Sequence, residues 1–574
     1  MQGFWELPAC YRHVAVPTLH WLAFSTLAPE GKMADIVIIN PRFDISFWGL
    51  EHCMPLFGKR ANLPVSCLAL LAALVPDHHQ VTLIDENVEE IDFDRLGRAD
   101  LVCLTGMSIQ GTRLLEILDE VKSRGVMVVV GGPMATVEPE ILEGEADVIF
   151  VGEADETWPR FLREWEQGSH QERYEQTEKT DMASLPLPRV ELLKADRYMF
   201  GSLQISRGCP FTCEFCDIIV TFGRRPRLKT SEQVLAELES FERAGLKIVF
   251  VVDDNLIGNK KAIKDVLRDI IAWQQERAYP LTLFTEASLD LAEDDELMEL
   301  MGLAGFQSVF IGIETPNEDS LKETKKLQNV RPNAGSLLER VHRIQAHGLD
   351  VWCGMIVGFD HDDPSIFQVM PKFLAESRIS AALIGLLHAI PTTPLYDRLK
   401  QAGRLNDHDA ADLYGTNVVP LGMSPEALRD GFIQVMQECY APDAYFERLD
   451  DQFFGEDFKF VMHELPYWKS HRLAWIKRSF FNYVKFGAVA SRLLSVVKDD
   501  ALRARYKQQL SRVVRQRWRE PHILFIYTIK VAMHYHYSAL AHALAQVDDK
   551  TGAMPDAGRS FSRAKRPVKE RAVA

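Results

Sequence analysis

Short apolar segments alternate with helix-length segments twice along this 574-residue chain, and this alternation limits the fold more than any other feature of the sequence. The first alternation fills residues 33–165. Its apolar segments are residues 36–40, 81–85, 101–107, 126–130 and 148–151. Buried strands that alternate with helices predict a parallel sheet covered on both faces. This region is therefore expected to be a doubly wound, Rossmann-like α/β domain.

Glycine-containing turns follow the later strands of this first domain. Gly131, Gly132 and Pro133 follow the fourth strand, and Gly152 and Glu153 follow the fifth. In an open α/β sheet, ligands bind beyond the carboxyl ends of the strands, so these turns predict a ligand-binding edge. The alternative interpretation is that the glycines only make tight turns.

The second alternation fills residues 199–405 and contains six strand–helix units. Its apolar segments are residues 203–206, 248–252, 281–285, 308–313, 351–357 and 382–389. Six such units predict a partial (β/α)6 barrel, with the active site at the carboxyl ends of the strands. The polar, proline-punctuated residues 166–198 are expected to be a linker between the two domains.

The remaining segments lack a strand pattern. Residues 1–32 are interpreted as an N-terminal extension that is dispensable or a misassigned start, because a strand pattern begins directly after Met33. Residues 406–547 are expected to form a mostly helical C-terminal domain. Residues 548–574 are polar and basic, and are expected to be a disordered tail.

Charge is divided unevenly along the chain. The net charge is −16, but residues 467–574 carry 22 Lys and Arg against 7 Asp and Glu, a net of +15, so the first 466 residues carry −31. Bases alternate with aromatic residues over 472–486, which is consistent with a solvated helical lid, docking on an anionic membrane or binding to nucleic acid. We expect no nucleic-acid partner and a cytoplasmic protein, with peripheral contact at the inner membrane face as the alternative to a solvated lid.

Three of the nine cysteines lie within eight residues. Cys209, Cys213 and Cys216 have the spacing C-x3-C-x2-C, directly after the first strand of the expected barrel. Three thiolates in one loop can bind three irons of an iron–sulfur cube and leave the fourth iron open to a ligand. A zinc site needs four ligands, and no fourth is near in sequence. Three clustered structural cysteines are the remaining alternative.

With Phe215 before its last cysteine, this loop resembles the signature of the radical SAM enzymes, and the resemblance extends over residues 195–405. It implies a [4Fe-4S] cluster whose open iron binds S-adenosylmethionine (SAM), and a 5′-deoxyadenosyl radical formed from that SAM. Strand ends of the expected barrel match the family's SAM-contacting positions. The residues that the resemblance implies as SAM contacts are Phe215, Asp254, Glu286, Ser288, Gly312, Glu314, Gly354 and Gly358.

Residues 33–165 resemble the cobalamin-binding domain of the same superfamily, through Gly131, Gly132 and Pro133 and through Gly152 and Glu153. The Asp-x-His-x-x-Gly segment that supplies a histidine to cobalt in many cobalamin enzymes is absent. The resemblance therefore implies cobalamin with its own base displaced and without a histidine ligand. The residues expected to face the corrin are Met107, Ser108, Ile109 and Gln110. The alternative is a degenerate domain that no longer binds cobalamin.

The whole architecture resembles cobalamin-dependent radical SAM methyltransferases, close to the hopanoid C-2 methylases. The resemblance implies C-methylation of an unactivated carbon in an apolar or lipid metabolite, with methylcobalamin as methyl donor and a flavodoxin- or ferredoxin-type protein as reductant. It implies no side chain as catalytic acid or base. The alternatives are a non-methylating enzyme such as a tetrapyrrole cyclase or a ring-contraction enzyme, a tRNA methylthiotransferase, and a non-catalytic cobalamin sensor.

Overall fold

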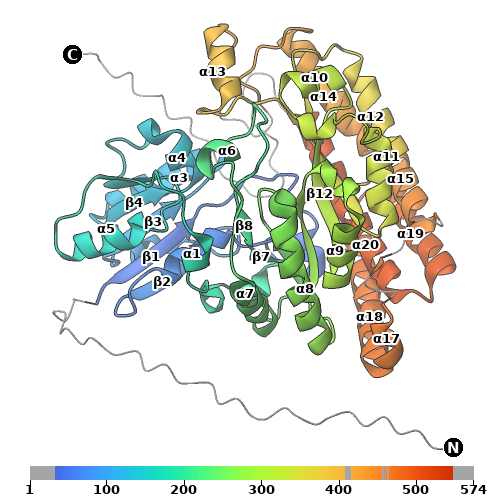
Figure 1. Cartoon of the computed structure of the whole chain (residues 1–574), viewed down its shortest axis with the longest axis horizontal. Coiled ribbons are helices and arrows are strands. Elements are labelled where there is room, and N and C mark those ends of the chain that lie inside the picture. Colours follow the sequence, from blue (N-terminus) through green and yellow to red (C-terminus); the bar gives the residue numbers. More distant parts are fainter. Residues whose placement is uncertain (1–32, 407–414, 456–457, 459, 462–464, 547–574) are drawn as a thin grey trace, which may run out of the picture.

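The computed structural model describes residues 33–406, 415–455, 458, 460, 461 and 465–546. Figure 1 shows one α/β unit drawn in blue to cyan, a second in green to yellow, and a group of orange to red helices at the edge of the second unit. The predicted extension 1–32 and the predicted tail 548–574 lie outside the described residues. Within the predicted C-terminal domain, residues 407–414, 456–457, 459, 462–464 and 547 also lie outside them.

The first unit contains a six-stranded, wholly parallel sheet with the order β2-β1-β3-β4-β5-β6. Its strands are β1 (Asp35–Asn40), β2 (Gln80–Asp85), β3 (Leu101–Thr105), β4 (Met127–Gly131), β5 (Val148–Val151) and β6 (Arg173–Glu175). Its helices are α1 (Ser66–Ala73), α2 (Phe93–Leu96), α3 (Gly111–Lys122), α4 (Pro133–Val137) and α5 (Thr157–Glu166). Alternate residues of β1 enter different cores: Val37 packs with α3, whereas Ile36 packs with α1 and α5. Since helices cover both faces, the doubly wound prediction is confirmed.

Strand β6 lies inside the segment predicted to be a linker. It pairs with β5 in parallel, from Ile149 opposite Arg173 to Val151 opposite Glu175. Only Tyr174 of its three residues is buried, so an apolar run does not mark this strand. The edge of the sheet, rather than a local sequence pattern, determines its conformation.

The second unit contains six parallel strands in the order β7-β10-β11-β12-β13-β14. The strands are β7 (Gly201–Leu203), β10 (Ile248–Val251), β11 (Thr282–Ala287), β12 (Phe306–Glu314), β13 (Asp350–Val357) and β14 (Ala382–Leu386). The helices are α6 (Ile218–Thr221), α7 (Ser231–Arg243), α8 (Lys260–Glu276), α9 (Asp295–Ala304), α10 (Glu318–Glu323), α11 (Leu337–Ala346), α12 (Ile366–Ser377) and α13 (Pro394–Gln401). Because β7 and β14 are both edges, the sheet stays open, as a partial barrel requires.

Short elements lie within and between these units. A two-stranded antiparallel ribbon pairs β8 (Ser206–Arg207) with β9 (Arg227–Leu228). The 3-10 helices are η1 (Met54–Phe57), η2 (Ser108–Gln110), η3 (Pro139–Ile141), η4 (Met182–Ser184), η5 (Val190–Leu192), η6 (Ala195–Arg197), η7 (Leu256–Asn259), η8 (Leu289–Glu293) and η9 (Leu327–Asn329).

The C-terminal region is helical, as predicted. It contains α14 (Pro425–Cys439), α15 (Pro442–Phe454), α17 (Tyr467–Ser470), α18 (Arg472–Val496), α19 (Asp500–Arg517) and α20 (Pro521–Leu544). Helix α20 packs in the main hydrophobic core, and its Lys530 forms an ion pair of 2.5 Å with Asp350 at the start of β13. Among the described residues, no helix has the length and hydropathy needed to cross a bilayer.

His536 of α20 attaches the helical region to the loop after β1. Its Nδ1 accepts a hydrogen bond from the His52 amide (3.3 Å), and its Nε2 lies 2.8 Å from the Ser46 carbonyl oxygen. Burial, with a contribution from His52, lowers the pKa of His536 to about 3. The folded protein therefore holds this ring neutral, with its proton on Nε2.

We expect acid to weaken this attachment. Histidine in an unfolded chain has a pKa of about 6.5. Below that pH the unfolded chain binds a proton at this position, whereas the folded chain does not, so the free energy of unfolding falls as the pH falls. Between pH 7.5 and 5.5, the free energy of unfolding should fall by about 1.4 kcal/mol more in the wild type than in His536→Gln. Urea titrations at both pH values measure this difference. The exposed control His170→Gln should follow the wild type, and identical pH dependence in wild type and His536→Gln would contradict the prediction.

Candidate functional site

The cysteine loop leaves β8 through a position that requires glycine. Gly208 has φ of +97°, and a Cβ there would lie 2.9 Å from the carbonyl oxygen of Gly223 and 3.0 Å from that of Arg225. Its amide donates a hydrogen bond of 2.8 Å to Oδ2 of Asp254, at the carboxyl end of β10. The loop that contains Cys209 is thereby held over the end of the sheet.

All three predicted cluster thiols are free in this loop. The Gln328 amide nitrogen lies 3.5 Å from Sγ of Cys213, and that of Asn255 lies 3.9 Å from Sγ of Cys209. Burial raises the pKa of Cys209, and it raises that of Cys216 to about 12. Buried thiols next to amide donors suit ligation, because a metal ion stabilises the thiolate that burial disfavours. The loop thus fits an iron–sulfur cube.

The carboxylates at the strand ends have different roles. Asp253 is fully engaged, because it accepts hydrogen bonds from the Ile205 amide (2.7 Å) and the Ser206 hydroxyl (2.6 Å). Asp254 holds Gly208, so both aspartates support the cysteine loop. Glu286 of β11 instead lines a cavity, and burial, with Asp254 and Asp253 nearby, raises its pKa to about 8.

Asn255 connects this group to the next strand end. Its side-chain oxygen accepts a hydrogen bond of 3.2 Å from the Ser288 amide, and its nitrogen lies 3.1 Å from the Ser288 hydroxyl. Ser288 is itself buried and donates to Asp290. Asn255 thus links Ser288 to the cysteine loop.

A buried ion pair occupies the end of β12. Glu314 has the left-handed φ of +67° and lies 2.6 Å from Nζ of Lys326. Lys326 also lies 5.9 Å from the centre of the Phe215 ring. Burial alone would lower the pKa of Lys326, but Glu314 and Cys213 raise it above its ordinary value. Strained backbone of this kind gathers at functional sites.

Glycines make room for this pair. A Cβ at Gly312 would lie 2.2 Å from Glu314 Oε1 and 2.7 Å from Lys326 Nζ, and one at Gly354 would lie 3.3 Å from the Phe310 ring. Gly358, at the end of β13, has φ of +105°, and its amide donates to Asp362. The predicted SAM contacts on β12 and β13 are therefore brought to one edge of the sheet.

A cavity of about 1730 Å³ separates the two α/β units. Met107, Ser108, Ile109 and Pro133 line it from the first unit, together with the loop after β1. Residues of β7, β10, β11 and β14 line it from the second unit. Ligand pockets usually have about 300–1000 Å³, so this cavity has room for more than one ligand.

The side chains of two predicted cobalamin contacts, Gln110 and Glu153, point into the protein and do not line this cavity. Gln110 is buried below the loop, where its side chain accepts from the Met107 amide (2.8 Å) and donates to Asn40 (3.1 Å). Glu153 has a buried side chain that pairs with Arg207 and Arg227, each at 2.8 Å. Hydrogen bonds from these arginines lower the pKa of Glu153, against the rise that burial alone would cause. Glu153 therefore joins the first domain to the base of the cysteine loop.

The three predicted glycines act through the backbone. Gly132 has φ of +92°, and a Cβ there would lie 2.5 Å from the Thr105 hydroxyl. Gly152 has φ of +94°, and a Cβ there would lie 2.7 Å from the Gln176 carbonyl oxygen. Gly131 ends β4 against Phe150. These glycines therefore allow the turns after β4 and β5 to pack closely against neighbouring backbone and side chains.

Sequence reasoning missed two groups at the site. Lys326 follows Lys325, and such a pair is typical of solvated surface, so its pairing with Glu314 was not predicted. His388 follows β14 and lines the cavity, where burial lowers its pKa. Its position just beyond the end of a barrel strand could have identified it as a candidate site residue.

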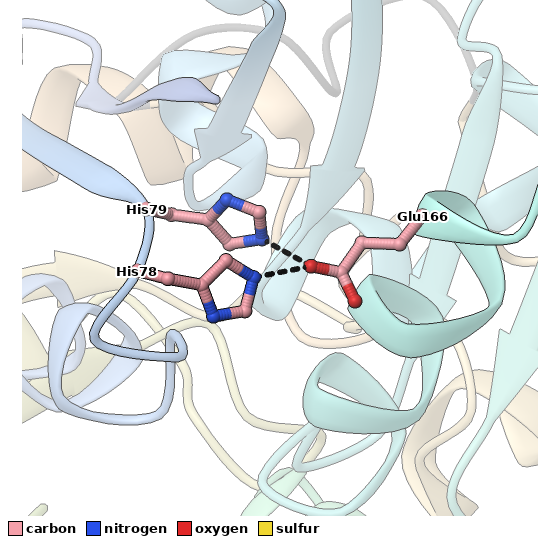
Figure 2. A group of neighbouring side chains, drawn as sticks. All are labelled: His78, His79 and Glu166. Carbon is pink, nitrogen blue, oxygen red and sulfur yellow. Dashed lines mark hydrogen bonds and ion pairs between the residues drawn. The ribbon is translucent and has the colours of Figure 1, made fainter. Parts of the chain in front are cut away.

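His78, His79 and Glu166 form a separate cluster on the first domain (Figure 2). Both Nε2 atoms approach one Glu166 oxygen, at 2.5 Å for His78 and 2.9 Å for His79. The Ala34 amide donates to Nδ1 of His79 (3.3 Å), which leaves the proton of the neutral ring on Nε2. A ligating histidine instead donates through its second nitrogen. The cluster is therefore a hydrogen-bonded contact between the start of β2 and the end of α5.

The sequence matches three family models in order. Residues 62–162 match the B12 binding domain, residues 203–373 the Radical SAM superfamily, and residues 393–549 a domain of unknown function (DUF4070). The chain is 38% identical to an uncharacterized methyltransferase of Synechocystis sp., over 72% of this chain and 77% of that protein. It is 34% identical to the hopanoid C-2 methylase of Rhodopseudomonas palustris, over 73% of this chain and 79% of that protein.

The chain belongs to the cobalamin-dependent radical SAM methyltransferases. A solved structure with the same fold is the radical SAM methyltransferase TsrM of Kitasatospora setae, with cobalamin and a [4Fe-4S] cluster bound. The TM-score is 0.57 at 14% identity, over 78% of this chain and all of that one. The predicted cofactors of this methyltransferase, a [4Fe-4S] cluster, SAM and cobalamin, are confirmed at the level of the family.

Proposed function

We propose that this methyltransferase acts on an unactivated carbon of an apolar metabolite, and that a hopanoid lipid is its substrate. The observation that carries the proposal is a cavity bounded by the cobalamin domain on one side and by the radical SAM strand ends on the other. An sp³ carbon has no usable pKa, so acid–base catalysis cannot activate it. Bound cobalamin, SAM and cluster supply the radical and methyl-transfer chemistry that the side chains lack.

The cavity walls suit a hydrocarbon ligand. Phe47, Trp48 and Phe250 line it, and the Trp48 ring lies 6.0 Å from that of Phe250. Met107 and Ile109 present exposed apolar side chains from the opposite domain. Such walls bury apolar surface and exclude water from a radical reaction.

The polar residues that line the cavity on the radical SAM side are Ser202, Asp217, Glu286, His388, Tyr396 and Asn417. Because the pKa of Glu286 is about 8, its carboxyl group is mostly protonated at pH 7 and places little charge against an apolar substrate. Burial lowers the pKa of His388, which favours its neutral form. In this proposal, Cys209, Cys213 and Cys216 hold the cluster.

The substrate class rests on the relative in Rhodopseudomonas palustris that is named for hopanoid C-2 methylation. A large cavity with both apolar and charged walls is compatible with that substrate but also with a tetrapyrrole, so the product decides. The flavodoxin- or ferredoxin-type reductant stays a prediction.

Product analysis of the reconstituted enzyme tests the proposal. With SAM carrying a deuterated methyl group, a reductant and a hopanoid, we expect 5′-deoxyadenosine and a hopanoid that has gained one labelled methyl group. Loss of hydrogen without added carbon would indicate a cyclase or ring-contraction enzyme. Cobalamin binding without any SAM cleavage would indicate a sensor and would contradict the proposal.

A further inference from the structure

Helix α18 exposes an apolar stripe along one face. Leu473, Ile476, Phe480 and Val484 have exposed fractions of 84, 61, 62 and 51%. Their spacing of three or four residues places them on the same side of the helix. Figure 1 shows α18 at the lower end of the helical region, next to α17. Continuous apolar exposure of this kind marks an interaction surface.

Further exposed aromatic residues flank the stripe, two of which have a polar group on the ring. Phe481 and Tyr483 are exposed on α18, and Trp518 is exposed just after α19. The Tyr483 hydroxyl donates a 2.5 Å hydrogen bond to the Trp518 carbonyl oxygen, which joins the two helices. The Arg519 guanidinium lies 5.1 Å from the centre of the Trp518 ring. Amphipathic aromatic rings beside cations are typical of a membrane–water interface.

The charge around the stripe is of one sign. Residues 467–498 contain seven Lys and Arg and no Asp or Glu. Arg478 and Arg492 turn inward to the carbonyl oxygens of Tyr279 and Leu56. Lys469, Arg472 and Lys477 are exposed beside the stripe. The surface therefore combines apolar side chains with unbalanced positive charge.

We propose that this face of α18 docks the protein on an anionic lipid bilayer, with the aliphatic and aromatic side chains at the headgroup level and the bases against lipid phosphates. Interfacial helices bind membranes by this combination. The first 466 residues carry a net charge of −31, so an anionic surface repels the body of the protein and selects this face.

Other occupants fit the surface less well. In a symmetric contact with a second copy, the positive charges of the two α18 faces would oppose each other. Single-stranded nucleic acid stacks its bases on aromatic rings, whereas Leu473, Ile476 and Val484 offer aliphatic surface. A bilayer accommodates both the aliphatic stripe and the bases.

The far end of α18 reaches the cavity wall. Arg492 donates a hydrogen bond of 3.0 Å to the Leu56 carbonyl oxygen in η1, and the neighbouring Pro55 lines the cavity. One rigid helix thus joins the proposed docking face to the substrate cavity. The relevance of this link to a lipid substrate rests on the proposed function, whereas the docking itself does not.

Sedimentation of the full-length protein with vesicles tests the docking. We expect binding to vesicles of phosphatidylcholine with phosphatidylglycerol, weak binding to phosphatidylcholine alone, and loss of binding at high salt. The double variant Ile476→Ser/Phe480→Ser should bind at least about tenfold more weakly. The pair Arg472→Gln/Lys477→Gln should bind about 25-fold more weakly at low salt.

The matched control is Val369→Ser/Leu421→Ser, which removes two other exposed apolar side chains (43 and 64%) far along the chain from α18. It should bind like the wild type. Circular dichroism and SAM cleavage verify that each variant is folded. The proposal is overturned if anionic vesicles do not sediment the wild type, if the control loses as much binding as the α18 variants, or if the α18 variants instead abolish a dimer or an oligonucleotide complex. Methylation of a detergent-solubilised hopanoid would be unaffected by such a failure, so the two proposals are separable.

Discussion

Replacing Cys213 by alanine should remove the cluster and all SAM cleavage. The thiol is one of three in the loop and the one that Gln328 contacts at 3.5 Å. Two remaining thiols cannot hold a cube that binds through three, so iron should fall from about four per chain to near zero after reconstitution. Iron analysis, the visible absorbance of the cluster and 5′-deoxyadenosine formation measure the loss.

Cys353 provides the matched control. It is fully buried in β13, also without a disulfide, but it lies in the hydrophobic core and not in the loop. Cys353→Ala should keep the iron and the absorbance and lose only stability. Retention of cluster iron and SAM cleavage in Cys213→Ala would refute the assignment of the cysteine loop.

Replacing Asp350 by alanine should destabilise the protein by about 3–5 kcal/mol, because it removes the carboxylate partner of the buried Lys530. Both side chains are buried, and Asp350 also accepts hydrogen bonds from Trp352 (2.7 Å) and Gln452 (2.8 Å). The variant removes the attachment of α20 to the start of β13. Urea unfolding followed by circular dichroism gives the change in free energy.

A surface ion pair is the control for this effect. Asp295 lies 2.9 Å from Arg343, with both side chains at least half exposed. Asp295→Ala should cost less than about 1 kcal/mol, since exposed pairs contribute little. Equal losses in the free energy of unfolding in the two variants would contradict the prediction that the buried pair contributes more to stability than the exposed pair.

Much of the fold was predictable because its elements depend on local patterns. The run at 36–40 is apolar on both faces, and β1 does lie between two helix layers. The strand β6 was not predictable in this way, because only Tyr174 is buried and an edge pairing with β5 defines it.

The site was predictable where one short segment contains the chemistry. The spacing of Cys209, Cys213 and Cys216 within a single loop is such a case. Gln110 and Glu153 lie close in sequence to cavity residues, yet their side chains turn to Asn40 and to Arg207. Lys326 reaches Glu314 from a separate turn. Side-chain direction depends on partners that are distant in sequence, so a local motif does not specify it.

The sequence by itself determined two parallel α/β units, a three-cysteine loop after a barrel strand and a basic helical C-terminal region. These follow from runs, spacing and composition, which are local properties of the chain. Only the tertiary structure decided that the two units enclose one cavity, that Glu153 joins them to the cysteine loop, and that α18 leaves its apolar stripe in solvent. The physical reason is burial: whether a side chain faces a core, a partner or water depends on the packing of segments far apart in sequence.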